Sequence, residues 1–358
     1  MGCGNIAPTY LKAPRLFPSL QIVACADLIP ERSRARAAEY GVSRACTPEE
    51  LLSADDLDVI LNLTVPIAHA EVSRQALLHG KHAYSEKPAA VNLQDGQELL
   101  NLAAQRGLRF GGAPDTFLGA GMQTCRALID SGAIGVPVAA TAFMLSHGPE
   151  AWHPDPYFFF QPGAGPLFDM APYYLTALVN LLGPVARTTG FARAGFSQRT
   201  VGSGPKAGEV IPVNTPTHVT SCLEFSSGPT ATLVMSFDVW HSEAPRIEIY
   251  GSEGSLSLPD PNTFGGPVRI RAAADKEWRD VPVTRPFTTD SRGIGVAEMG
   301  FAIRAGRPQR ASGDLTVHVL EVMQAALTAA ESASVIRIQS QPARPAALPE
   351  GQTEDILR

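Results

Sequence analysis

The chain has 358 residues, of which 44% are apolar and 18% charged, and its formal net charge is -6. This length suits two domains, and the composition is that of a globular protein rather than a disordered chain. The sequence has no basic stripe, which argues against nucleic acid as a partner, and no apolar run long enough to span a membrane. The N-terminus also lacks the basic and apolar segments of a secretory signal.

Five cysteines are scattered along the chain, and none stands in a C-x-x-C spacing. This pattern argues against a disulfide framework and against a zinc site, and it favours the reducing cytoplasm. We therefore predict a cytoplasmic protein without a bound metal, in which most of these cysteines are small buried apolar residues. They are Cys3, Cys25, Cys46, Cys125 and Cys222.

The first third of the sequence alternates short apolar runs with helical patterns. Strands are predicted at residues 21–27, 58–64, 82–85 and from 109 onward, and helices at 29–40, 69–79 and 93–106. Strand and helix in alternation indicate right-handed βαβ units and a parallel sheet. We expect an α/β Rossmann domain over residues 1–115.

Residues 2–7 read G-C-G-N-I-A and match the G-x-G-x-x-G/A fingerprint of dinucleotide-binding turns. Asp27 ends the next predicted strand, where a carboxylate can bind the adenosine ribose hydroxyls and would repel the 2′-phosphate of NADP. We therefore predict NAD as the cofactor, although the nearby Arg32 and Arg34 leave NADP open. The alternative interpretation is a plain glycine turn beside a surface carboxylate.

One part of the expected nucleotide-binding fold precedes the fingerprint and is not in this sequence. The glycine turn should follow a central strand, yet the chain begins at Met1. Without that strand its two parallel neighbours would lose their shared hydrogen-bonding partner. We expect a start site upstream of Met1 or a truncated polypeptide.

After about residue 114 the pattern changes. Helices are predicted at 118–131, 166–182 and 316–332, and strands at 136–146, 218–225, 230–239, 246–250, 255–258 and 268–271. Consecutive strands without helices between them indicate an antiparallel or mixed sheet. We expect an α+β substrate and oligomerisation domain with an open sheet at 116–340, followed by a flexible Pro-rich tail at 341–358.

Two short segments carry the candidate chemistry. Lys87 follows the strand at 82–85 in the run Glu86-Lys87-Pro88, and ligands of parallel sheets bind beyond the carboxyl ends of strands. There a lysine can hold a substrate hydroxyl and relay its proton, and Pro88 is a candidate cis peptide. Asp169 and Tyr173 are four apart on a predicted helix and share one face. The alternatives are a solvated lysine and a surface Asp–Tyr pair.

A dense aromatic segment spans residues 152–160. Sugars stack their C–H faces on aromatic rings, so Trp152, His153 and Tyr157 are candidate substrate contacts. Packing between domains is an equally good explanation of the same residues. No cluster of His, Asp and Glu has metal-ligand spacing, and no G-x-S-x-G elbow occurs.

With these motifs in hand, the chain resembles the Gfo/Idh/MocA family of dehydrogenases over roughly residues 1–335. Glu86-Lys87-Pro88 is its most specific motif, and residues 64–69 and 250–256 resemble the family loop after the third strand and a hairpin of the second sheet. The resemblance implies that Lys87 is the catalytic lysine and Asp169 its carboxylate partner. Tyr173 stands where the family usually has histidine, as in the glucose–fructose oxidoreductase branch.

The resemblance also implies contacts and partners. Family members act on sugars and related hydroxyl compounds and form dimers or tetramers through the second sheet. Base work by Tyr173, with an ordinary pKa near 10, would require the lysine cation to lower that pKa. The expected cofactor contacts are Gly2, Gly4, Asn5, Ile6, Asp27, Thr64, Pro66, His69, Glu86 and Lys87.

We therefore expect hydride transfer between a nicotinamide and a secondary hydroxyl or ketone of a sugar or sugar derivative. Lys87 and Tyr173 would handle the hydroxyl proton, and Asp169 would orient them. Two alternatives remain open. One is a glycoside-cleaving enzyme that uses bound NAD as a recycled oxidant, and the other is a sensor that binds NAD or sugar without catalysis.

Overall fold

The computed structural model describes residues 1–358, and its first 115 residues alternate short parallel strands with helices. Two parallel sheets form, one of β1 and β2 and one in the order β3-β4-β5. The predicted Rossmann architecture is confirmed. Its elements are α1 (Ala7–Leu11), η1 (Ala13–Arg15), β1 (Ala24–Ala26), α2 (Pro30–Tyr40), β2 (Arg44–Cys46), α3 (Pro48–Ser53), β3 (Val59–Asn62), α4 (Pro66–Leu78), β4 (His82–Ser85), α5 (Leu93–Gln105) and β5 (Phe110–Gly112).

The first two residues lie between the two parallel sheets. The Met1 amino group donates to the Leu61 carbonyl at 2.7 Å, and the Met1 carbonyl accepts from the Leu63 N–H at 2.8 Å. On the other side, the Gly2 N–H donates to the Ala26 carbonyl at 2.8 Å. Residues 1 and 2 therefore stand where the sequence predicts a missing central strand, and they bond to both β1 and β3.

The second half of the chain builds a nine-stranded sheet in the order β15-β14-β13-β12-β6-β11-β10-β7-β16. β6 and β11 run parallel and all other neighbours antiparallel, so the predicted mixed sheet is confirmed. Its strands are β6 (Pro137–Leu145), β7 (Val185–Arg193), β10 (His218–Phe225), β11 (Thr230–Ser236), β12 (Ile247–Gly251), β13 (Gly254–Leu258), β14 (Val268–Ala272), β15 (Arg279–Val281) and β16 (Ile336–Arg337). The remaining elements are η2 (Thr116–Leu118), α6 (Ala120–Asp130), η3 (Tyr157–Phe160), α7 (Gly165–Leu182), β8 (Gln198–Thr200), β9 (Val210–Pro212), α8 (Ile294–Ala305), α9 (Gly313–Ser332) and η4 (Glu354–Leu357).

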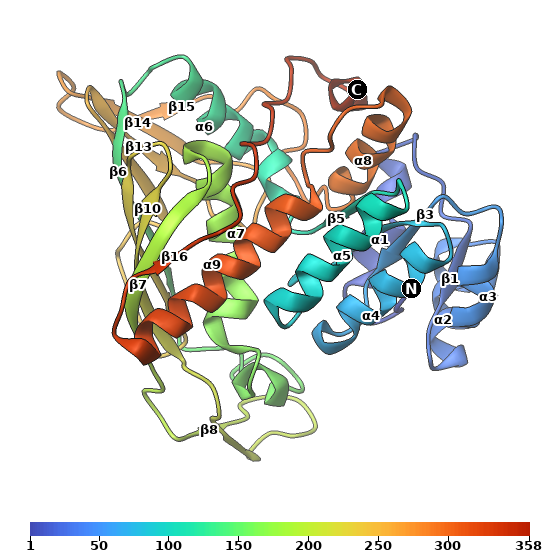
Figure 1. Cartoon of the computed structure of the whole chain (residues 1–358). Helices are drawn as coiled ribbons and strands as arrows, with labels where there is room; N and C mark the ends of the chain where they lie inside the picture. Colours follow the sequence, from blue (N-terminus) through green and yellow to red (C-terminus); the bar gives the residue numbers. More distant parts are fainter.

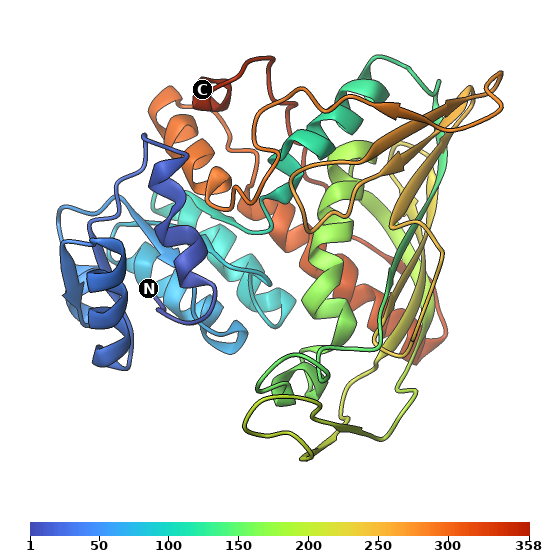
Figure 2. The same ribbon diagram turned by 180° about the vertical axis from the view of Figure 1, so that it is seen from behind.

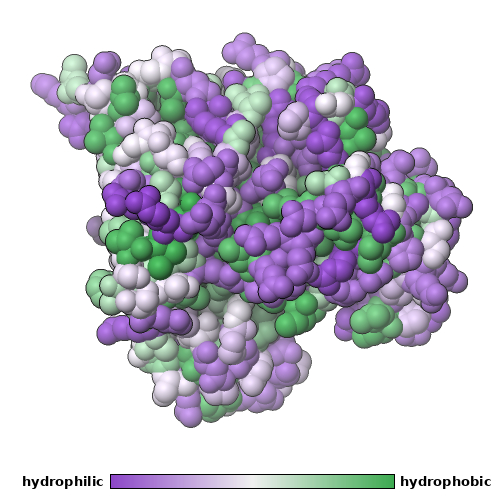
Figure 3. Space-filling model, viewed as in Figure 1, coloured by the Kyte–Doolittle hydropathy of each residue, from purple (hydrophilic) through white to green (hydrophobic).

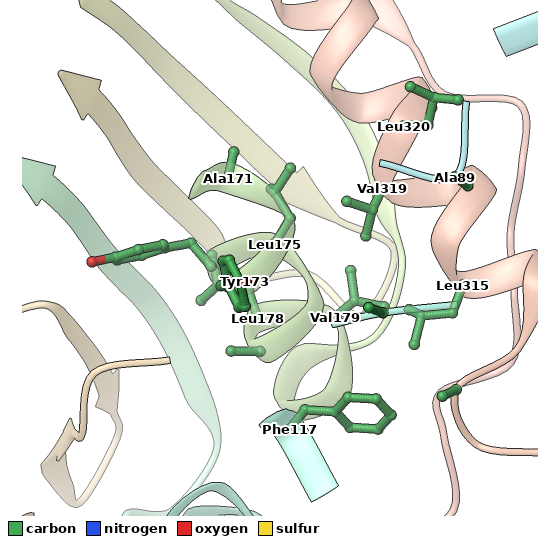
Figure 4. Packing of buried hydrophobic residues seen from close by; sticks show 14 of the residues in the cluster. Ala89, Phe117, Ala171, Tyr173, Leu175, Leu178, Val179, Leu315, Val319 and Leu320 are labelled. Atoms are coloured by element: carbon green, nitrogen blue, oxygen red, sulfur yellow. The ribbon is translucent and has the colours of Figure 1, made fainter. Parts of the chain in front are cut away.

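Helices α6, α7 and α9 cover one face of the large sheet and leave the other face bare (Figures 1 and 2). Leu175 and Val179 of α7 point toward Val319 and Leu315 of α9, and all four side chains are buried (Figure 4). Helix α9 also packs on α5 and β5 of the first domain. The hydrophobic core is accordingly continuous across both domains.

The segment 341–358 is not the loose tail that its Pro-rich, polar sequence predicts. The guanidinium of Arg126 donates to the Pro345 carbonyl at 2.7 Å, and Arg310 donates to the Ala346 carbonyl at 2.9 Å. Leu348 and Leu357 are buried. The prediction is wrong because buried arginines bind the backbone carbonyls of this segment, which needs no sheet or helix of its own to be held.

The face seen in Figure 3 carries small apolar groups that are separated by polar ones. None of the helices combines the length and the apolar character that crossing a bilayer requires.

Candidate active site

The glycine turn that precedes α1 has the shape that a dinucleotide needs. Gly2 has a φ of +90°, and a Cβ there would lie 2.6 Å from the backbone of Leu63, so no other residue fits. A Cβ at Gly4 would meet no atom within 4 Å. The space beside Gly4 is therefore open for the close approach of a pyrophosphate.

Asp27 lies directly against this turn. One carboxylate oxygen accepts from the Cys3 N–H at 2.8 Å, and the other accepts from the Ile29 N–H at 2.9 Å. Each oxygen keeps a free lone pair, and the residue is only partly buried. Asp27 can thus hold the turn and still accept hydrogen bonds from ribose hydroxyls.

The loop after β3 is tied to the Lys87–Pro88 segment through His69. Its Nδ1 lies 2.7 Å from the Pro88 carbonyl and its Nε2 lies 3.0 Å from the Thr64 carbonyl. Burial lowers the pKa of His69, against the pull of these two acceptors. The ring is enclosed, so it positions the loop around Thr64 and Pro66, and the peptide bond between Lys87 and Pro88 is cis, as predicted.

Glu86 connects the nucleotide turn to the lysine that follows it. Its Oε1 accepts from the hydroxyl of Tyr10 on α1 at 2.7 Å, and its Oε2 accepts from the Lys87 N–H at 2.9 Å. Tyr10 is fully buried. The carboxylate therefore fixes the end of β4 relative to the helix that begins at the glycine turn.

The structure brings Lys87, Asp169 and Tyr173 together, as the family resemblance implies. The Lys87 Nζ donates to the Asp169 Oδ1 at 2.8 Å and to the Asp169 carbonyl at 2.5 Å. It also lies 5.2 Å from the centre of the Tyr173 ring. Only 15% of the Lys87 side chain and 26% of the Asp169 side chain are exposed. An ammonium, a carboxylate and a phenol thus lie close together at the carboxyl end of β4.

Tyr173 could act as a general base only if its phenol were ionised, and the charges of this cluster do not favour that form. Burial alone lowers the pKa of Lys87, but Asp169 and Tyr173 outweigh burial and raise it, so the ammonium stays charged at neutral pH. Burial raises the pKa of Tyr173, and the lysine cation offsets this only in part. The condition that the lysine lowers the tyrosine pKa below its usual value is not met. The phenol of Tyr173 is therefore neutral near pH 7.

Asp115, which sequence reasoning missed, ties the Rossmann domain to α8. Its Oδ2 accepts from the N–H groups of Gly293 at 2.9 Å and Gly295 at 3.1 Å, at the start of that helix. Burial raises the pKa of Asp115 to about 6, and the two backbone donors and Arg292 only partly oppose it. The available signal was its place three residues after β5, at the carboxyl edge of the parallel sheet.

This buried carboxyl predicts a specific pH dependence of stability. Its folded pKa lies above the ordinary value of 3.8, so its contribution to stability is full below about pH 4 and is lost as pH rises through about 6. Asp115→Asn keeps an oxygen for both glycine N–H groups but cannot ionise. Between about pH 4.5 and 7.5 we expect wild type to lose roughly 2 kcal/mol relative to the variant. Urea unfolding of both proteins at these pH values measures this, and a constant difference would contradict it.

Arg292, one residue before Gly293, is a second missed member of the site. Its guanidinium donates to Asn262 Oδ1 at 2.7 Å and to Asp290 Oδ1 at 2.8 Å. Arg292 and Tyr173 influence each other's pKa, and the cation favours the ionised phenol. The Asp115 contact with Gly293 therefore also holds an arginine beside the predicted catalytic group. Nothing in the local sequence around Arg292 marks this role.

The predicted substrate contacts Trp152, His153 and Tyr157 lie in the loops before α7. His153 packs edge-on against Phe158 and Phe159, and Trp152 against His153. No hydrogen bond or aromatic contact joins these three residues to Lys87, Asp169 or Tyr173. Nowhere in the chain do three His, Cys, Asp or Glu side chains gather as metal ligands would.

Comparison with known proteins decides the family. Residues 1–112 match the oxidoreductase family with an NAD-binding Rossmann fold, and residues 122–257 match the GFO/IDH/MocA C-terminal domain. The chain belongs to the Gfo/Idh/MocA family. As this family assignment implies, the protein is an NAD-binding oxidoreductase, and the open space at Gly4 and the free lone pairs of Asp27 fit that cofactor.

Relatives of this Gfo/Idh/MocA protein carry the names of sugar reductases. A dTDP-3,4-didehydro-2,6-dideoxy-alpha-D-glucose 3-reductase from Streptomyces violaceoruber is 29% identical over 87% of this chain and 88% of its own. A 1,5-anhydro-D-fructose reductase from Ensifer adhaerens is 27% identical over 72% of this chain and 73% of its own.

The fold is shared with solved structures of lower identity. Levoglucosan dehydrogenase, in a complex with NADH and L-sorbose, superposes with a TM-score of 0.80 at 20% identity, covering 95% of this chain and 97% of that one.

Proposed function

We propose that this oxidoreductase transfers a hydride between NAD and a secondary hydroxyl or ketone of a sugar or sugar derivative. The observation that carries the proposal is that Asp169 and Tyr173 of α7 meet Lys87 at the end of β4. Glu86, the residue before Lys87, accepts a hydrogen bond from Tyr10 on the helix that follows the glycine turn. The sugar class is supported by the relatives, which are named as a deoxysugar reductase and an anhydrofructose reductase.

The roles of the three side chains follow from their charge. The Lys87 ammonium, held by Asp169, donates a hydrogen bond to the substrate oxygen and stabilises negative charge that develops there. Tyr173 exchanges its phenolic proton with the same oxygen. Bound NAD supplies the hydride acceptor, and NADH the hydride donor. Because Tyr173 is neutral and Lys87 charged near pH 7, the resting protein is ready to protonate a ketone that is being reduced.

The finer assignments of cofactor, compartment and assembly rest on separate features. Asp27 supports NAD over NADP, because a carboxylate after this strand would repel a 2′-phosphate. The five cysteines are all free, which supports a reducing cytoplasm. The bare face of the large sheet exposes Phe191 on β7 and supports a dimer or tetramer through this face.

A direct test incubates the protein with NAD or NADP and a panel of sugars, and with NADH and the corresponding keto sugars. We expect oxidation or formation of the reduced cofactor with at least one sugar pair, and a higher kcat/KM with NAD than with NADP. Because Tyr173 is neutral near pH 7, sugar oxidation should increase above neutral pH while ketone reduction stays nearly constant.

Two outcomes would replace the proposal. Release of an aglycone without net formation of NADH would indicate a glycoside-cleaving enzyme that recycles its bound NAD. Saturable binding of NAD and a sugar, with no turnover of any panel member, would indicate a sensor.

A further inference from the structure

Exposed aromatic side chains gather on the loops at one end of the large sheet. Five rings there are between 45% and 69% exposed, although aromatic side chains of this size are usually mostly buried. We call this group the aromatic platform, and it consists of Trp152, Tyr157, Phe158, Phe196 and Trp240. Trp240, 69% exposed, stacks on His147 with ring centres 3.3 Å apart and planes 13° apart. One face of the indole is therefore covered, which leaves the other as a flat apolar surface.

The platform is fixed from below by a buried ionic network. Arg199 donates to Glu150 at 2.8 Å and to Asp238, and these side chains are 4%, 8% and 11% exposed. The guanidinium also lies 4.6 Å from the Phe196 ring centre. A buried network of this kind contributes little net stability compared with apolar residues, but it sets geometry. It joins the loops before α7, before β10 and after β11.

This platform lies beside the N-terminus of α7, the helix that carries Asp169 and Tyr173. Asn214 N–H donates to the Phe160 carbonyl at 2.8 Å, and a Cβ on Gly165, the first residue of α7, would lie 2.7 Å from the Pro216 carbonyl. Asp169 comes four residues after Gly165, about 6 Å along the helix axis. Helix η3, which carries Tyr157 and Phe158 of the platform, also packs on α7. The platform therefore adjoins the end of α7 that carries Asp169.

The charged residues on these loops indicate the charge of a ligand ring that the platform could bind. Arg199 is paired with two carboxylates, Lys206 with Asp155 at 2.8 Å, and Arg246 with Asp260 at 3.6 Å. No lysine or arginine of these loops is left to bind a phosphate or a carboxylate of a ligand. The surface is thus suited to an uncharged ring with C–H faces, which stacks on indole, and His153 beside Trp152 offers a polar neighbour for hydroxyls.

We propose that the aromatic platform binds a second, uncharged sugar ring, so that the substrate is a glycoside or disaccharide whose other ring reacts at Lys87 and Tyr173. The identity of the reacting ring rests on the proposed function, but stacking on Trp240 does not require turnover. Binding and catalysis can therefore be tested separately.

The test uses the three tryptophans of the chain. Trp278 lies next to β15 and contacts Arg269 rather than the platform, so Trp278→Phe leaves Trp152 and Trp240 as the only indoles. The probes are cellobiose, lactose and maltose, each compared with glucose and galactose. We expect a saturable change in tryptophan fluorescence with at least one disaccharide and a much weaker response to both monosaccharides.

Replacement of the stacking ring provides the second arm. Trp240→Ala should raise the Kd of that disaccharide about tenfold, the usual effect of losing one aromatic contact. It should lower kcat/KM for the disaccharide by a similar factor and leave a monosaccharide substrate within about twofold. Trp278→Ala is the matched control and should change neither value.

The outcomes are separable. If none of the three disaccharides changes the fluorescence, the proposal is overturned. An equal loss of kcat/KM for disaccharides and monosaccharides in Trp240→Ala also overturns it, because it would indicate a structural role for Trp240. A change in oligomeric state, seen by sedimentation as dissociation of an oligomer in Trp240→Ala, also overturns it in favour of a second copy of the chain. A fluorescence response without turnover supports the platform and contradicts the proposed function alone.

Discussion

Replacement of Lys87 by alanine is expected to lower kcat by about a thousandfold, the usual range for loss of a proton-handling group. The Lys87 ammonium is the cation nearest to Asp169, with which it forms an ion pair at 2.8 Å, and it lies over the Tyr173 ring. Without it, Asp169 is left unpaired in a partly buried site, and the pKa of Tyr173 rises further because the opposing cation is gone. Steady-state kinetics on the best sugar of the panel measures the effect.

Two comparisons separate the charge from packing and folding. Lys87→Met keeps the length of the side chain, so it should lose as much activity as Lys87→Ala if the ammonium is what matters. Lys276→Ala removes an exposed lysine far from the site and should be neutral. NAD affinity, measured by calorimetry, should change less than about threefold in all of them. Turnover by Lys87→Met close to that of wild type would remove Lys87 from the catalytic group.

Gly4→Ala is expected to weaken NAD binding by about a hundredfold, while the melting temperature stays within about 2 °C of wild type. A Cβ at Gly4 would touch nothing within 4 Å in the protein itself. The methyl group would instead occupy the space in which the pyrophosphate approaches the backbone. Calorimetry with NAD and thermal unfolding without it provide the two readouts.

Gly2→Ala is the matched contrast. Here the methyl group would lie 2.6 Å from backbone atoms of Leu63, at a φ of +90°. This variant should therefore lose stability as well as cofactor binding. If Gly4→Ala bound NAD as tightly as wild type, the pyrophosphate would have to lie elsewhere, and the assignment of the turn would fail.

The members of the Lys87–Asp169–Tyr173 cluster were predictable because each lies in a short segment with its own pattern. Lys87 directly follows an apolar strand, and Asp169 and Tyr173 share one face of a helix. Their approach to one another follows from the family resemblance, since 82 residues separate Lys87 from Asp169. What the pattern could not supply was the balance between burial and charge that sets the pKa of Tyr173.

Residues that act through long-range contacts were beyond sequence reasoning. Asp115 accepts a hydrogen bond from Gly293, which is 178 positions away in the sequence. Arg199 donates one to Asp238, which is 39 positions away. Asp115 lies in a loop and Arg199 in the short strand β8, and only the folded chain shows that each is buried and paired. The same applies to Trp240, whose neighbour His147 lies on another loop.

Among the elements that sequence reasoning missed, β7 and α8 were missed for local reasons. Strand β7 carries Arg187, Gly190 and Arg193, which interrupt the alternation of a half-buried strand, and α8 contains two glycines, which lower helix propensity. Both elements form because neighbours supply partners: β10 and β16 flank β7, and Asp115 holds the first turn of α8.

Helix α9 has a consequence for how the protein moves. It packs against β5 and α5 on one side and against α7 and β7 on the other, so it belongs to both domains at once. A hinge rotation of one domain against the other would have to slide this twenty-residue helix across a close-packed surface. We therefore expect the two sheets to move as one rigid body. Under the proposed function, opening and closing of the substrate site would then fall to the loops around residues 146–164 and 194–217, and product release is expected to depend on their motion.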